Sequence, residues 1–186
     1  MRIGGGKFRG RQVETPRGRK TRPSGGRLKK SLFDILAPVL PGSRVLDLFA
    51  GAGGLGLEAL SRGAAHVTFV ERDRGAADTI RKNLERLGLS EKAELLRREA
   101  RSAIGLLAER QETFDIILLD PPYRSDLHAS LLQRIGAASV VKLEGVVILE
   151  HHHKTSLADS YAGLTKVREV RAGESSLSFY RFPSSV

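Results

Sequence analysis

The chain has 186 residues, of which 40% are hydrophobic, and its 31 Lys and Arg against 21 Asp and Glu give a formal net charge of +10. This length suits one globular domain with a single core. Because the sequence contains no Cys, disulfides, thiolate zinc sites, iron–sulfur clusters and cysteine nucleophiles are excluded.

The positive charge is concentrated at the start of the chain. Residues 1–30 contain eleven basic residues and one acidic residue, Glu14, whereas basic and acidic residues balance from residue 31 onward. A cationic arm on a neutral body is typical of a protein that recruits a polyanion. Charge alone leaves a solvated, disordered tail as the alternative. We expect an ordered arm, because Phe8 and Val13 alternate with basic neighbours as in a short hairpin.

A helix is predicted next, over Ser24–Leu40. Its apolar residues have helical spacing, Ser24 can cap its start, and Pro38 and Pro41 can close it. We expect this helix to pack on the body of the protein.

After Gly42, short aliphatic runs alternate with amphipathic stretches, which predicts an α/β fold with a mostly parallel sheet. The predicted parallel strands are Arg44–Phe49, His66–Glu71, Ala93–Arg97, Phe114–Asp120 and Gly145–Glu150. The predicted helices are Leu55–Arg62, Asp73–Leu87, Ala100–Arg110 and Asp126–Ala137. Two last strands, Leu164–Arg171 and Leu177–Phe182, are expected to form an antiparallel pair at one edge.

A glycine-rich turn follows the first predicted strand. Gly51, Gly53 and Gly56 have the spacing of a nucleotide-binding turn, whose glycines let backbone N–H groups approach a ligand beyond the ends of the strands. The pattern fits NAD(P), FAD or S-adenosylmethionine, and a tight turn without a ligand is the structural alternative.

Asp47 favours S-adenosylmethionine, because a carboxylate at this place would repel a pyrophosphate but attract an ammonium or sulfonium group. Its alternative role is to cap the turn.

Glu71 ends the second strand and can accept both hydrogen bonds of a ribose diol. Asp73 is better placed to cap the next helix, which leaves Glu71 free for the ligand. Glu99 and Ala100 occupy the loop where an adenine ring would lie, or else belong to a surface charge cluster. The predicted cofactor-binding residues are Asp47, Phe49, Ala50, Gly51, Ala52, Gly53, Glu71, Arg72, Glu99 and Ala100.

The fourth strand runs directly into Asp120-Pro121-Pro122-Tyr123. Each residue before a proline is held extended, so the loop forms a rigid rim. Asp120 and the Pro121 carbonyl can accept the two N–H bonds of an exocyclic amino group while Tyr123 stacks on the base. Such bonds direct the nitrogen lone pair toward an electrophile and stabilise the charge that develops during methyl transfer. These four residues, Pro122 included, are the predicted catalytic residues; a Pro-rich loop with a surface aromatic is the alternative.

His151-His152-His153 suggests a metal site, but neighbouring residues of an extended segment point in opposite directions. We therefore expect a strand-end loop near the substrate cleft and no metal.

These motifs resemble those of a class I S-adenosylmethionine-dependent methyltransferase, and nearly the whole chain resembles the bacterial 16S rRNA (guanine-N2)-methyltransferase family of the RsmD type. The similarity rests on Arg2-Ile3-Gly4-Gly5, Arg9-Gly10-Arg11, Arg22-Pro23-Ser24, Arg27-Leu28, Leu32-Phe33, residues 47–64 and residues 120–123. The chain departs from the family pattern at Ala52, where Ser is usual, at Lys30, where Glu is usual, and at Gly25-Gly26.

The resemblance implies a Rossmann-like fold with a seven-stranded, mostly parallel sheet, helices on both faces and an N-terminal basic arm. It implies methyl transfer from S-adenosylmethionine to the N2 amino group of a guanine in 16S rRNA, within a partly assembled small ribosomal subunit. The arm, residues 1–27, would bind RNA and residues 28–186 would form the methyltransferase domain. We expect a cytoplasmic monomer without membrane contact. The implied RNA-binding residues are Lys7, Arg9, Arg11, Arg22, Ser24 and Arg27.

Four other functions are the alternatives. A DNA adenine-N6 methyltransferase shares the Asp-Pro-Pro-Tyr motif but normally needs a target-recognition domain, for which the chain has no room. The second is an enzyme that methylates a protein glutamine, but such sites favour Asn at the position of Asp120. The third is an NAD(P)-binding oxidoreductase, but the sequence shows no residues typical of a hydride-transfer site. The fourth is a non-catalytic rRNA-binding module.

Overall fold

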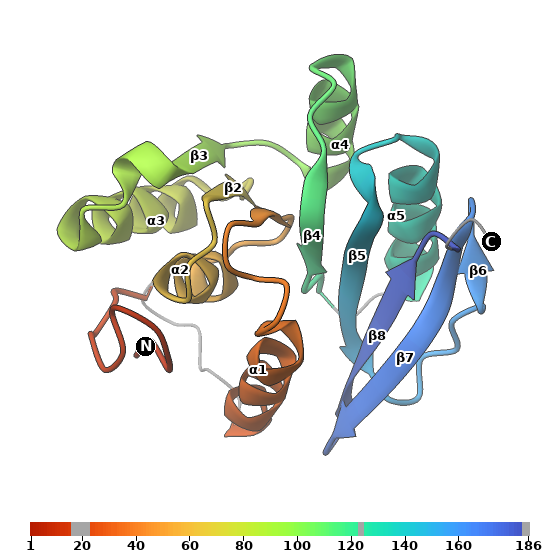
Figure 1. The fold of residues 1–186 in the computed structure, drawn as a ribbon, viewed down its shortest axis with the longest axis horizontal. Helices are drawn as coiled ribbons and strands as arrows, with labels where there is room; N and C mark the ends of the chain where they lie inside the picture. Colours follow the sequence, from red (N-terminus) through yellow and green to blue (C-terminus); the bar gives the residue numbers. More distant parts are fainter. Residues whose placement is uncertain (16–22, 123–124, 184–186) are drawn as a thin grey trace.

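The computed structural model describes residues 1–15, 23–122 and 125–183, which form one mixed sheet with helices on both faces (Figure 1). The helices are α1 (Pro23–Leu36), α2 (Gly54–Ser61), α3 (Arg74–Leu87), a short 3-10 helix η1 (Ser90–Lys92), α4 (Ala100–Glu109) and α5 (Ser125–Ala137). The strands are β1 (Arg44–Asp47), β2 (His66–Val70), β3 (Ala93–Leu96), β4 (Phe114–Leu119), β5 (Val141–His152), β6 (Ser160–Tyr161), β7 (Leu164–Ala172) and β8 (Ser175–Arg181).

The sheet has the strand order β3-β2-β1-β4-β5-β8-β7-β6. Strands β1 to β5 are parallel, and β8, β7 and β6 continue the sheet with antiparallel pairing. The predicted five parallel strands and the antiparallel pair are thus confirmed. The count of seven is wrong by one strand, because the two residues of β6 pair with the start of β7 and are too few to show an apolar period in the sequence.

Two hydrophobic cores cover the two faces of the sheet. Ile116 packs in the core that contains α1, α2 and α3, whereas its neighbour Ile117 packs in the core that contains α4 and α5. Successive residues of a strand point to opposite faces, so a strand buried on both sides needs an unbroken apolar run. Residues 116–119 of β4 have that composition and are fully buried.

The N-terminal arm is ordered over residues 1–15, as expected. Arg2 and Gln12 pair as an antiparallel bridge, and Ile3, Phe8 and Val13 are buried in the α1–α3 core. The hairpin lies beside α2 and α3 (Figure 1). It is therefore part of the folded body and not a tail.

Helix α1 is shorter than predicted and begins earlier. It starts at Pro23, so Ser24 is inside the helix and is not its cap, and it ends at Leu36 instead of Leu40. Proline suits the first position of a helix, and the residue before Pro38 is pushed out of helical conformation, which explains both ends. The expected boundary after residue 27 falls within α1.

The histidine segment also differs from its prediction. His151 and His152 are in β5, paired with Ser176 and Ser175 of β8, and are not in a loop. The added antiparallel partner extends β5 beyond the point where its apolar pattern ends. In the described ranges, no three potential metal-ligating side chains gather, and no helix combines the length and apolar character needed to cross a membrane.

Candidate cofactor and substrate site

The candidate site lies where the parallel strands β1 and β4 end. They are neighbours in register, with Asp47 beside Leu118, and the N–H group of Leu48 donates to the carbonyl of Leu118 at 3.0 Å. The expectation that the ends of the first and fourth strands share one edge is confirmed. The connections run toward β2 on one side and toward β5 on the other, so this is the switch point at which open α/β sheets bind ligands.

The glycine turn connects β1 to α2 through a sharp bend. Gly53 has a φ of 82°, a backbone conformation that would be strained for a residue with a side chain. Its N–H group donates to the carbonyl of Ala50 at 2.7 Å. A Cβ on Gly56 would collide with the Phe69 ring and lie 2.9 Å from Val67. The turn therefore needs glycine for its conformation at one position and for close packing on β2 at the other.

Asp47 is a buried carboxylate with only one oxygen satisfied. It is 1% exposed, and its Oδ2 accepts the N–H group of Gly56 at 3.0 Å. Its Oδ1 has no hydrogen-bond partner among the residues that the structure describes. Burial, with the nearby carboxylates of Asp120 and Glu71, raises the pKa of Asp47 to about 7, although Gly56 and Lys29 act in the opposite direction. Asp47 therefore does cap the turn through Oδ2, and its Oδ1 can accept a hydrogen bond from a cationic donor.

Glu71 is not free, contrary to the prediction. One carboxylate oxygen accepts the N–H group of Gly51 and the other accepts that of Asp73, each at 2.8 Å. Asp73 itself caps α3 through the N–H group of Ala76, as predicted. Glu71 thus connects the glycine turn to β2, and because an ionised carboxylate has about four acceptor positions, it can still accept ribose hydroxyls.

The other predicted cofactor residues lie along the same edge. Glu99 caps α4 by accepting the N–H groups of Arg101 and Ser102 at 2.9 and 3.3 Å, so its side chain is already engaged. Ala100 is buried at the start of α4, and Arg72 is exposed at the end of β2. In the turn, Ala50 is buried and Phe49 and Ala52 are half-buried.

The Asp-Pro-Pro segment follows β4 at the same edge. Asp120 is exposed, Pro121 is buried and Pro122 is exposed. Asp120 comes two residues after Leu118, the register partner of Asp47, and its charge helps to raise the pKa of Asp47. Tyr123 lies outside the described residues.

The basic residues of the hairpin are exposed. Lys7 and Arg11 lie over the Phe8 ring, with 5.6 and 5.7 Å to its centroid, and Arg9 is exposed on the same hairpin. Across the described ranges, none of the three forms an ion pair. Arg27 is exposed on α1. Arg22 lies outside the described residues, and Ser24 is placed by its backbone only.

Three polar residues connect the glycine turn to the hairpin and to α1, and the sequence interpretation missed them: Asn83 and Glu58 are buried, and Lys29 is partly exposed. Asn83 of α3 accepts from the N–H group of Glu14 at 2.8 Å and donates to the carbonyls of Glu14 and Ala52 at 3.1 and 3.4 Å. Glu58 and Lys29 form an ion pair of 3.2 Å beside the turn. The signal for Glu58 was available, since it is the one charged residue in the otherwise apolar helix α2.

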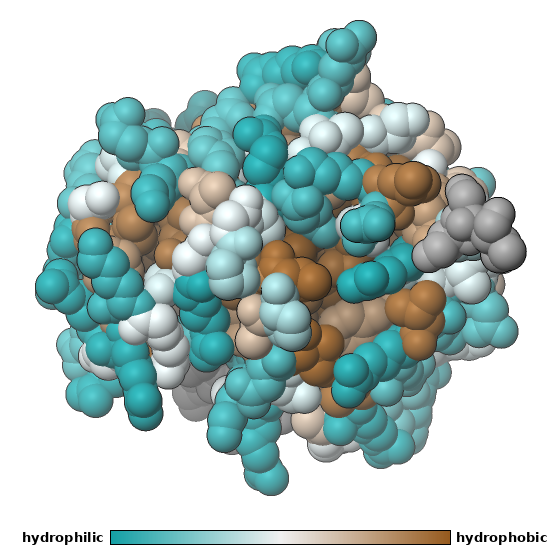
Figure 2. All heavy atoms as spheres, in the orientation of Figure 1, coloured by the Kyte–Doolittle hydropathy of each residue, from teal (hydrophilic) through white to brown (hydrophobic). Residues whose placement is uncertain are grey.

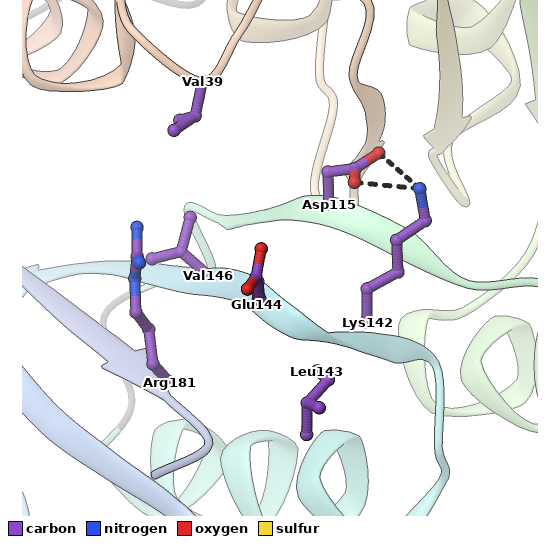
Figure 3. A pocket seen from close by; sticks show the side chains of 7 residues that line it. All are labelled: Val39, Asp115, Lys142, Leu143, Glu144, Val146 and Arg181. Atoms are coloured by element: carbon purple, nitrogen blue, oxygen red, sulfur yellow. Dashed lines mark hydrogen bonds and ion pairs between the residues drawn. The ribbon is translucent and has the colours of Figure 1, made fainter. Parts of the chain in front are cut away.

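A cavity of about 480 Å³ lies away from the candidate site, at the amino-terminal end of the parallel strands β4 and β5. Its lining includes Lys142, whose ammonium pairs with Asp115 at 2.8 Å (Figure 3). Figure 2 shows hydrophobic atoms gathered over the β4–β5–β8 side of the visible face, between hydrophilic borders. This cavity is separate from the edge that carries Asp47 and Asp120.

Known proteins and solved structures are similar to this chain over nearly its whole length. The family model described as Conserved hypothetical protein 95 matches residues 1–181. Ribosomal RNA small subunit methyltransferase D of Escherichia coli strain K12 is 34% identical over 181 residues, which cover 97% of this chain and 89% of that protein. YlbH of Bacillus subtilis, a candidate rRNA methyltransferase, is 36% identical and covers 97% and 98%. The solved structure of yhhF, a candidate methyltransferase from Escherichia coli, has a TM-score of 0.88 and 33% identity, covering 100% of this chain and 99% of that one.

Proposed function

The chain belongs to the family described as Conserved hypothetical protein 95, and from that membership and the site we propose that it transfers the methyl group of S-adenosylmethionine to the N2 amino group of a guanine in 16S rRNA. A relative in Escherichia coli, matched over 97% of this chain and 89% of its own length, is named as a small-subunit rRNA methyltransferase. That name supports both the reaction class and the ribosomal RNA substrate.

The observation that carries the proposal is the buried, half-satisfied carboxylate of Asp47 beside the Asp120 loop. An orphaned buried carboxylate oxygen needs a hydrogen-bond donor or a cation. S-adenosylmethionine offers an ammonium group and no phosphate, and it supplies an electrophilic methyl group on a sulfonium. Asp47 and the residues 49–53 would hold its amino-acid part, Glu71 and Arg72 its ribose, and Glu99 and Ala100 its base.

Asp120 and the Pro121 carbonyl would hold the target amino group. Both are acceptors, so they bind the two N–H hydrogens and leave the nitrogen lone pair directed at the methyl group. The nitrogen gains a methyl group and releases one proton, which the exposed Asp120 carboxylate can take up or pass to water. Pro121 and Pro122 keep the loop extended, and Tyr123 would stack on the flipped base.

The arm would hold the RNA. Lys7, Arg9 and Arg11 are exposed cations that pair with no carboxylate in the described ranges, and such cations are suited to phosphate groups. Arg22, Ser24 and Arg27 are the further proposed contacts. Residues 1–27 would therefore act as the RNA-binding arm and residues 28–186 as the methyltransferase domain. The substrate would be a partly assembled small subunit in the cytoplasm, bound by a monomer.

Replacing Asp120 tests the proposal. We expect Asp120→Ala to lower methyl transfer to 16S rRNA by about 100-fold or more, because a donor or acceptor aimed at developing charge is worth that much. Binding of S-adenosylhomocysteine, measured by calorimetry, should change less than about threefold, since Asp120 is not assigned to the cofactor.

Asp159→Ala, at an aspartate whose side chain is 92% exposed, is the matched control and should keep full activity. Nucleoside mass analysis of the product should show N2-methylguanosine. N6-methyladenosine, or equal loss of turnover and cofactor affinity in Asp120→Ala, would contradict the proposed reaction.

A further inference from the structure

Lys29 connects helix α1 to the glycine turn. Its side chain is 22% exposed, and its Nζ donates to the carbonyl of Gly54 at 2.7 Å. Gly54 is the first residue of α2 and directly follows the turn. A lysine in this place holds the backbone at the point where the turn becomes a helix.

The ammonium of Lys29 is held by a buried carboxylate. Glu58 is 1% exposed and lies 3.2 Å from Nζ, and it also accepts the N–H group of Gly4 and the guanidinium of Arg62, each at 2.8 Å. Burial raises the pKa of Glu58, but these three partners outweigh burial and lower it overall. Burial lowers the pKa of Lys29, while Glu58 and Asp47 oppose that effect.

We propose that Lys29 is a positioning residue of the cofactor site: its ammonium holds the carbonyl of Gly54, two residues before the N–H group of Gly56 that binds Asp47, and so fixes the turn around that carboxylate. This inference rests on the proposed function. It assigns to α1, next to the RNA-binding arm, a direct part in preparing the cofactor turn.

The groups around Asp47 explain why a cation is needed. Glu71 from β2 and Asp120 from the loop after β4 both add negative charge, while α2 contributes the N–H group of Gly56 and α1 contributes the ammonium of Lys29. Two carboxylates and burial favour the protonated form of Asp47, which cannot bind an ammonium group. Removal of Lys29 leaves those effects opposed by the Gly56 N–H group, so protonated Asp47 should persist to higher pH.

The test compares Lys29→Met with Lys30→Met. The two lysines are neighbours on α1, but Lys30 is exposed, so the second variant makes the same chemical change away from the turn. Carbon-13 NMR of the Asp47 carboxyl group follows its titration in the ligand-free protein, and calorimetry gives the affinity for S-adenosylhomocysteine at each pH.

We expect Lys29→Met to raise the pKa of Asp47 by about 0.5–1 unit and to weaken binding at pH 7 by about two- to fivefold. Lys30→Met should change neither quantity, and Lys29→Arg should restore both. If Lys29→Met does not fold, Lys29→Gln removes the charge and keeps a hydrogen-bond donor to Gly54.

A folded Lys29→Met or Lys29→Gln variant in which Asp47 titrates as in the wild type would overturn the inference. Wild-type protein that binds no S-adenosylhomocysteine would instead contradict the proposed function, and the NMR comparison would still decide whether Lys29 acts on Asp47.

Discussion

At the scale of single residues, the burial of the Asp47 carboxylate lowers the stability of the fold when it is ionised, the form in which it is proposed to bind the cofactor. It is buried, accepts one N–H group and lies near two other carboxylates. Its pKa of about 7, above the ordinary 3.8, means that the folded protein takes up a proton more readily than the unfolded chain does. The stabilisation from that proton is complete below pH 3.8 and is lost as the pH rises through about 7.

We therefore predict that Asp47→Asn stabilises the protein at pH 8, by at most about 4 kcal/mol, and gives little gain near pH 4. Asparagine keeps the acceptor for Gly56 but carries no charge. The same variant should bind S-adenosylhomocysteine at least about tenfold more weakly. Thermal unfolding at the two pH values and calorimetry measure these effects. An equal stability change at both pH values would show that folding does not raise the pKa of Asp47.

At the scale of elements, the hairpin and α2 form one unit. The N–H group of Phe8 donates to Oγ of Ser61 at 2.9 Å, Ser61 Oγ donates to the carbonyl of Gly5 at 2.6 Å, and the N–H group of Lys7 donates to the carbonyl of Ser61 at 2.7 Å. Deleting the arm would therefore remove core side chains as well as charge. A charge-only change separates RNA binding from stability.

The triple variant Lys7→Gln, Arg9→Gln, Arg11→Gln should weaken 16S rRNA binding without lowering the unfolding temperature. The slope of log affinity against log salt should become shallower by about 0.7–0.9 for each phosphate group that the arm no longer binds. The matched control removes one lysine and two arginines that are exposed elsewhere, at Lys92, Arg168 and Arg171. Identical salt slopes for the wild type and the hairpin variant would refute the RNA-binding role of the arm.

At the scale of the whole molecule, the pH dependence of stability involves groups from both the sheet and the helices that cover it. His128 of α5 is 1% exposed, and within the described part of the chain neither ring nitrogen has a hydrogen-bond partner. Burial, and then the neighbouring His151 of β5, lower the pKa of His128. Because the folded protein holds this ring neutral, the stability it contributes is present above its ordinary pKa of 6.5 and is lost as the pH falls.

We predict that His128→Leu makes the protein less sensitive to acid. The difference in unfolding temperature between this variant and the wild type should widen as the pH is lowered from about 7.5 to 5.5, since only the wild type must keep a buried imidazole neutral. His153→Leu, on the turn after β5, is the control. A difference that does not change with pH would mean that His128 gains no proton on unfolding in this range.

Features that depend on nearby residues were predictable from the amino-acid sequence. Alternating apolar runs and amphipathic stretches predicted the parallel strands, the helices and the antiparallel pair, and two local motifs predicted that β1 and β4 carry Asp47 and Asp120 to one edge. Spacing and turn chemistry act within a few residues, so one sequence is enough to find them.

Which polar groups already form hydrogen bonds or ion pairs within the protein depends on the tertiary structure. Glu71 was expected to be free, yet it accepts N–H groups from its own strand end and from the glycine turn 20 residues away; Lys29, Glu58 and Asn83 gained their roles from segments up to 69 residues distant. The extension of β5 likewise required β8 beside it. Burial and hydrogen bonding depend on which segments distant in the sequence come into contact, and local sequence patterns do not specify those contacts.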